Sequence, residues 1–168
     1  AARSVYDFRN RAFRIEMREQ GRWKTVLSRT IVAEANTFAP YLIGVSGDGG
    51  FIVILDTQAH GADGKGAERR FHYYGLKPSG ELSGPLETGE ASQARTVFNP
   101  RSGRLAGFAY TAEEPRYDIS DPGLRDLYDK AVSSTSGQTA EVLSVSDDER
   151  KALIRVTGGA DTGSYYRL

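Results

Sequence analysis

Two adjacent glutamates and a nearby arginine are the strongest candidates for chemistry in this chain: Glu113, Glu114 and Arg116. Paired carboxylates can exchange protons with a substrate, and together with a guanidinium they can clamp a charged ligand. A charged turn between strands on a solvated surface is the competing interpretation. As catalysts of glycoside hydrolysis they fit poorly, because adjacent residues rarely supply carboxylates on opposite sides of a sugar. We therefore expect these residues to contact a substrate or a neighbouring domain.

The other polar motifs favour structural interpretations. His60 and His72 lack the short-spaced partners of a zinc site. The glycine-rich stretch 56–66 ends in Gly-Lys-Gly before a predicted strand, whereas a phosphate-binding loop needs Gly-Lys-Ser/Thr before a helix. It also lacks the alternating acidic ligands of a calcium loop. We expect no metal and no cofactor.

A serine nucleophile is also not indicated. The closest string to the Gly-x-Ser-x-Gly elbow runs from Gly44 to Asp48 around Ser46, and it lacks the second glycine. A hairpin turn is the better interpretation, and we expect no catalytic residue in this chain. The sequence has no cysteine, which excludes disulfides and a thiol nucleophile but leaves both periplasm and cytoplasm open.

The composition is that of an ordinary globular protein. Of 168 residues, 39% are hydrophobic and 26% charged, and 22 basic residues balance 22 acidic ones. A balanced charge provides no field to attract nucleic acid or anionic lipid, and the longest apolar run is far below the ~20 residues that cross a bilayer. We expect neither nucleic acid nor a membrane as a partner.

The elements that would position these residues repeat along the chain. Three times an apolar run ends at a short polar turn and resumes at once, with Ser46, Asn99 and Ser146 closing the first strand of each pair. The second of these residues follows the first by 53 positions, and the third follows the second by 47. A period of about 50 residues is typical of β-propeller blades.

The pattern predicts an all-β fold: a partial β-propeller of about three four-stranded antiparallel blades with one short inserted helix. Residues 1–38 are interpreted as a half blade containing only the two outer strands, near 13–18 and 23–27. The first complete blade is expected to follow, with strands near 41–46, 50–56, 69–76 and 81–87. The predicted divisions are a half blade at 1–38, a blade at 39–90, a blade plus helix at 91–137 and a partial blade at 138–168.

The inserted helix has clear local signals. Asp121 is a predicted N-cap and Pro122 suits the first helical position. Leu124, Leu127, Tyr128 and Ala131 then follow at the spacing of one apolar stripe. The chain opens without a methionine or a signal-like segment and ends within a predicted strand, so we expect it to be a piece of a longer protein.

The segment from about Val97 onward resembles the N-terminal propeller of prolyl oligopeptidase family serine peptidases, particularly the bacterial dipeptidyl-peptidase-like branch. The strings that carry the resemblance lie at 97–110, 115–117, 121–122, 144–148 and 163–166. The resemblance implies a propeller that gates peptide access to an α/β-hydrolase domain of the same parent chain, where the catalytic triad of the family lies. Its implied partners are therefore a peptide substrate and that hydrolase domain.

Two alternatives stay open. Lasso-peptide isopeptidases are similar to the same branch, and a non-enzymatic propeller could bind a protein or peptide partner. In each case the longer loops at 56–67, 111–115 and 158–163 are expected to share one face of the disc. We expect that face to be functional, with Glu113, Glu114 and Arg116 as its charged contacts.

Overall fold

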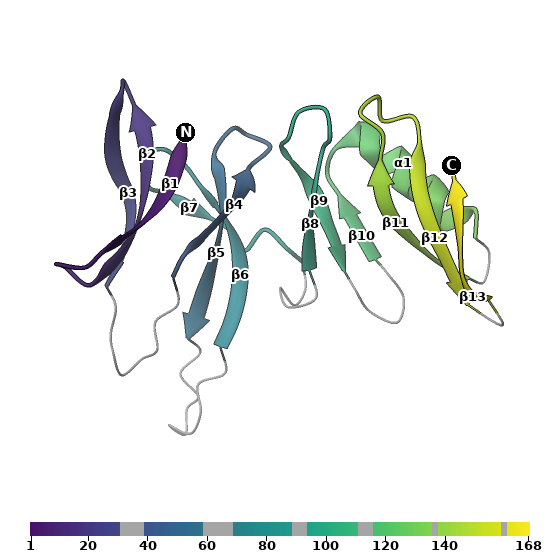
Figure 1. The fold of residues 1–168 in the computed structure, drawn as a ribbon, viewed down its shortest axis with the longest axis horizontal. Helices are drawn as coiled ribbons and strands as arrows, with labels where there is room; N and C mark the ends of the chain where they lie inside the picture. Colours follow the sequence, from purple (N-terminus) through teal and green to yellow (C-terminus); the bar gives the residue numbers. More distant parts are fainter. Residues whose placement is uncertain (31–38, 59–68, 89–93, 111–115, 136–137, 159–160) are drawn as a thin grey trace. The chain divides into compact units, whose positions relative to one another are not determined.

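The structure of the chain, a computed structural model, describes residues 1–30, 39–58, 69–88, 94–110, 116–135, 138–158 and 161–168. Its two compact units, Ala1–Ser92 and Gln93–Leu168, are described separately. The described residues form thirteen strands in four antiparallel sheets, together with one helix (Figure 1). The all-β class predicted from the sequence is confirmed. None of the described helical residues belongs to a helix long and apolar enough to cross a membrane.

Sheet 1 contains β1 (Ala2–Asp7), β2 (Ala12–Glu19) and β3 (Arg22–Thr30), in that order. The expectation of only two strands here was wrong, because β1 pairs along its whole length with β2. Most β1 side chains are exposed or half-buried, so this edge strand lacks the clean alternation that reveals a strand in sequence.

Sheet 2 contains β4 (Tyr41–Val45), β5 (Phe51–Gln58), β6 (Arg69–Leu76) and β7 (Leu82–Ser83). The four strands expected here are present, although the last has only two residues. The core of this unit combines Ile15 and Met17 of β2 with Val53, Leu55 and Leu76 of sheet 2. β2 alternates apolar and charged residues around Ile15 and Met17, whereas β5 supplies Val53 and Leu55 from a continuous apolar run.

The second unit contains sheet 3, with β8 (Ala94–Phe98), β9 (Leu105–Tyr110) and β10 (Arg116–Ile119). Sheet 4 contains β11 (Thr139–Val145), β12 (Ala152–Gly158) and β13 (Asp161–Arg167). Helix α1 (Pro122–Ser133) connects the two sheets along the chain and packs against β10, β11 and β12 (Figure 1).

The predicted helix is confirmed in its start and its buried face. Asp121 caps it by accepting the amides of Gly123 and Leu124 at 3.0 and 3.3 Å. The buried side chains are the four of the predicted stripe: Leu124, Leu127, Tyr128 and Ala131. They join a core that also contains Val142, Ile154 and Val156 of sheet 4, so the helix closes one side of this core.

Each sheet opens on a hairpin with a left-handed residue in its turn. In the three hairpins predicted from the sequence, the turn-closing bonds run from Ser46 N to Gly50 O, Asn99 N to Arg104 O and Ser146 N to Lys151 O, at 3.0, 2.8 and 2.9 Å. A register shift lies near the turn in all three pairs, with the extra residue on the first strand in sheets 2 and 4 and on the second strand, β9, in sheet 3. The repeat inferred from the sequence is therefore a repeat of local structure as well.

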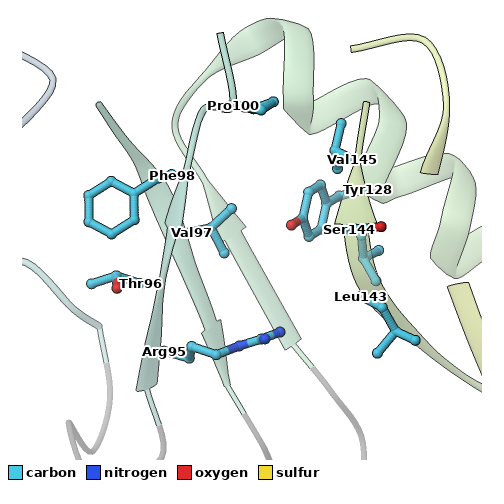
Figure 2. A pocket seen from close by; sticks show the side chains of 10 residues that line it. Arg95, Thr96, Val97, Phe98, Pro100, Tyr128, Leu143, Ser144 and Val145 are labelled. Atoms are coloured by element: carbon cyan, nitrogen blue, oxygen red, sulfur yellow. The ribbon is translucent and has the colours of Figure 1, made fainter. Parts of the chain in front are cut away.

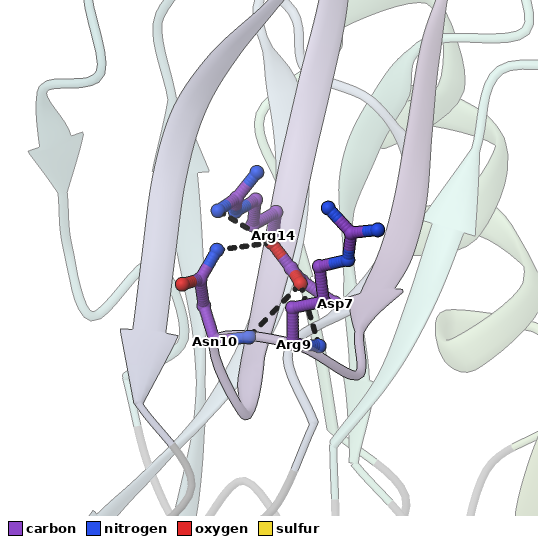
Figure 3. Close-up of polar contacts among 4 residues, drawn as sticks. All are labelled: Asp7, Arg9, Asn10 and Arg14. Atoms are coloured by element: carbon purple, nitrogen blue, oxygen red, sulfur yellow. Dashed lines mark hydrogen bonds and ion pairs between the residues drawn. The ribbon is translucent and has the colours of Figure 1, made fainter.

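Asp7 is the last residue of β1, and the turn after it forms a fourth hairpin, between β1 and β2. Its Oδ1 accepts the amides of Arg9 and Asn10 at 3.0 and 3.1 Å, and Arg14 forms an ion pair with Oδ2 at 2.6 Å (Figure 3). The carboxamide oxygen of Asn99 accepts the amides two and three positions later in the same way. The two strands expected in this segment are β2 and β3, and β1 precedes them in the sheet. Their interpretation as the outer strands of a blade stays a prediction.

At Gly107, β9 lies against β10 without room for a side chain. Its φ of 156° is one that side-chain-bearing residues rarely adopt, and an added Cβ would lie 2.1 Å from the carbonyl oxygen of Asp118. Only glycine fits between these strands.

Candidate functional site

The charged residues singled out in the sequence are only partly within the structure. Glu113 and Glu114 lie outside the described residues. Arg116 begins β10, and its guanidinium carbon lies 4.4 Å from the ring centre of Tyr110. This cation–π contact contributes about 0.5–1 kcal/mol at an exposed site and orients the guanidinium. A contact between Arg116 and a substrate stays a prediction.

His72 belongs to a structural contact, while His60 lies outside the described residues. The Nδ1 of His72 lies 2.5 Å from Oε1 of Glu87, a carboxylate that the sequence did not single out. The other oxygen of Glu87 accepts the amide of Tyr73 at 3.0 Å, so this buried carboxylate is fully engaged with β6. Burial, aided by the charge of Glu87, raises the pKa of Tyr73. The pair fixes the segment after β7 to sheet 2.

The serines of two hairpin turns donate hydrogen bonds to nearby aspartates. Ser46 donates its hydroxyl to Asp48, and Ser146 donates to Asp148 at 2.6 Å. These serine hydroxyls, followed by the backbone amides of Gly50 and Arg150, lower the pKa of the respective aspartates. The prediction that the string around Ser46 is a hairpin turn is confirmed.

Asn99 connects three segments of the second unit. It is 7% exposed, and its amide nitrogen donates to Asp121 Oδ2 at 2.8 Å and to Glu149 Oε1 at 2.9 Å. Its oxygen accepts the amides of Arg101 and Ser102, both at 2.9 Å. Every hydrogen-bonding group of this side chain is therefore used, and the start of α1 is tied to the opening hairpins of sheets 3 and 4. The sequence identified Asn99 and Asp121 separately, but nothing in their spacing linked them to Glu149.

A pocket of the second unit lies between the first strands of its two sheets. It has a volume of about 170 Å³ and is bordered by β8 on one side, by β11 on the other and by α1 (Figure 2). The described lining residues are Arg95, Thr96, Val97, Phe98, Pro100, Tyr128, Val142, Leu143, Ser144 and Val145. The lining combines apolar side chains with the guanidinium of Arg95 and the hydroxyls of Thr96, Tyr128 and Ser144.

Two tyrosines beside the pocket differ in their hydrogen bonds. The Tyr117 hydroxyl accepts the Val142 amide at 2.9 Å and donates to the Ala140 carbonyl at 3.3 Å, which links β10 to β11. The rings of Tyr117 and Tyr128 meet edge to face with their centres 4.9 Å apart. Burial raises the pKa of both tyrosines, and the charge of Arg95 opposes this shift.

The pocket lining offers polar and apolar groups but no serine–base pair among its described residues. Its described lining includes no histidine, aspartate or glutamate that could act as a base for Ser144. Among all described residues, no group of three or more metal-ligating side chains is gathered. The sequence did not predict this pocket, because its polar groups come from β8, α1 and β11, which no short motif connects.

Comparison with known proteins adds no family assignment: the chain matches no family model, no curated protein and no solved structure.

Proposed function

We propose that this chain is the propeller portion of a serine peptidase of the prolyl oligopeptidase family and gates peptide access to an α/β-hydrolase domain of its parent chain. The observation that supports the proposal is the repetition of one hairpin at the start of four successive antiparallel sheets. Radial repetition of small antiparallel sheets is how propellers are built. The peptidase assignment rests further on the resemblance of the strings at 97–110 and 144–148.

In this proposal the chain contributes recognition, and catalysis belongs to the hydrolase domain. Ser46 and Ser146 donate their hydroxyls to aspartates within their own turns, which supports a structural role for both. The pocket between β8 and β11 likewise provides binding groups without a serine–base pair among its described residues. A gate needs such surfaces and no nucleophile of its own.

The test uses the natural parent polypeptide, identified with an antibody against this chain. We expect a fluorophosphonate probe, which labels activated serines, to label that polypeptide and to leave the purified 168-residue chain unlabelled. Hydrolysis of linear peptides by the parent would support the peptidase, whereas exclusive cleavage of threaded lasso peptides would favour the isopeptidase. An unlabelled parent would overturn the proposal in favour of a non-enzymatic binding module.

Glu113, Glu114 and Arg116 are the proposed charged contacts to substrate or hydrolase domain. Reversing both glutamates to lysine in the parent should change its kcat/KM for charged peptides relative to neutral ones. The matched control reverses Asp147 and Asp148 in the hairpin of sheet 4. If only the control alters the preference, the opposite face is the functional one.

A further inference from the structure

Tyr128 lines the pocket between β8 and β11, and its ring is buried. Tyr128 is only 6% exposed, and in Figure 2 its hydroxyl points from α1 toward β8. Within the described part of the chain, every fully buried polar side-chain atom has a hydrogen-bond partner. The Tyr128 hydroxyl has no such partner there, so it is not fully buried. The open space that this hydroxyl meets is therefore the pocket. The neighbouring Tyr117 differs, because its hydroxyl is bonded to β11.

Arg95 supplies a positive charge to the same space. It extends from β8 along one end of the pocket, toward the side on which Tyr128 lies (Figure 2). Its charge is close enough to oppose the effect of burial on the pKa of Tyr128. It forms no ion pair with any residue that the structure describes. A guanidinium and a hydroxyl directed at one small space are the donors that a carboxylate accepts.

The remaining walls determine what else the ligand can carry. Val97, Leu143 and Val145 present apolar side chains. The volume of about 170 Å³ corresponds to roughly five or six water molecules at ~30 Å³ each. That space holds a carboxylate with a chain of a few carbons, or one small residue at the end of a peptide.

We propose that this pocket binds a carboxylate carried on a short apolar group, with Arg95 pairing with the carboxylate and the Tyr128 hydroxyl donating to it. The apolar chain would pack against Val97 and Val145. This site does not depend on a peptidase, since an isopeptidase or a binding module could use it equally. Its ligand can be a free short-chain acid or the carboxyl end of a peptide, which share this chemistry.

Binding is measured on the full chain by NMR, following the backbone amides of residues 95–98 and 142–145. The first pair of probes is butyrate and butyramide, which have similar shapes but differ in charge. The second pair is N-acetyl-alanyl-alanine and its carboxamide. We expect dissociation constants in the millimolar range for the acids, because ligands of this size make few contacts. The uncharged partners should bind at least about tenfold more weakly, since a charge-assisted hydrogen bond is lost.

Two variants test the named donors. Arg95→Gln should weaken acid binding about tenfold, and Tyr128→Phe, which keeps the buried ring, about three- to tenfold. Arg101→Gln and Tyr166→Phe, at positions outside the pocket lining, serve as controls and should leave binding unchanged. Unchanged thermal unfolding of each variant would show that the fold persists.

The outcomes separate clearly. Stronger binding of the dipeptide acid identifies a peptide end as the ligand, and binding of butyrate alone identifies a free acid; both support the site. Equal binding of butyrate and butyramide, no shift at either strand with any acid, or acid binding unaffected by both pocket variants would overturn it.

Discussion

Removing the Asn99 side chain should reveal how strongly the second unit depends on one amide group. The side chain makes four hydrogen bonds, two to backbone amides of its own turn and two to the carboxylates of Asp121 and Glu149. A neutral bond contributes about 1 kcal/mol to stability, and a bond to a charged group about 1.5 kcal/mol or more. Because water can replace part of what is lost at these half-buried partners, we expect Asn99→Ala to lower the free energy of unfolding by about 3 kcal/mol.

The assay is urea unfolding of the full chain followed by circular dichroism, with the slope of the transition compared between variants. Asn10→Ala is the matched control, because Asn10 makes one exposed side-chain bond to Asp7 in the turn of sheet 1. Its loss should cost about 0.5 kcal/mol or less. A decrease for Asn99→Ala that is no larger than the control would refute the assigned role.

A second variant tests the electrostatic part of the same argument. Asn99→Asp keeps an acceptor for the turn amides but places a third carboxylate against Asp121 and Glu149. Like charges should raise the folded-state pKa of the new carboxyl above its unfolded value of about 3.9. The variant's stability relative to the wild type should therefore improve as the pH falls through that raised pKa, and worsen as the pH rises. A deficit independent of pH would contradict this account.

Three further predictions concern single groups. Gly107→Ala should cost about 3 kcal/mol or prevent folding, because its Cβ would overlap the Asp118 carbonyl, whereas Gly103→Ala, with open space around it, should cost only about 1 kcal/mol in the same unfolding assay. Tyr117→Phe should lower stability by about 1–2 kcal/mol, since it leaves the Val142 amide without its bond to the hydroxyl; a decrease under 0.3 kcal/mol would contradict this. The pKa of the Asp148 carboxyl, measured by carbon-13 NMR, should lie below the ordinary value of about 3.9. The stability that this carboxylate contributes is then present above about pH 3.9 and is lost as the pH falls through its lower folded-state pKa. A midpoint at or above about 3.9 would be evidence against the Ser146 bond.

Local structure could be predicted from the sequence where the residue types at a position favour one kind of turn or helix end. Asp121 and Pro122 identified the start of α1, and the polar strings after Val45 and Val145 identified two hairpins. The hairpin after β1 was missed because no apolar run marks the strand before its turn, since the β1 side chains are exposed or half-buried. A left-handed residue other than glycine does not explain the difference, because the predicted hairpin of sheet 4 has Glu149 there, with φ of 59°.

The site was less predictable because it depends on tertiary packing. Tyr128 fits the apolar stripe of a helix, and from sequence its hydroxyl has no assigned direction. Only the packing of α1 beside β8 and β11 brings it to the pocket that Arg95 borders. Glu149 illustrates the same limit, since a charged residue in a predicted turn is expected to face water, yet it accepts a bond from Asn99.

The order of strands in every described sheet follows the order of the chain. Each strand therefore pairs with a neighbour in sequence, and the entropy lost on closing each connection is small. Chains dominated by such local pairings fold faster than those that must join distant segments. During synthesis each sheet can form once its own last strand has left the ribosome, so the growing chain need not expose all its apolar strands together.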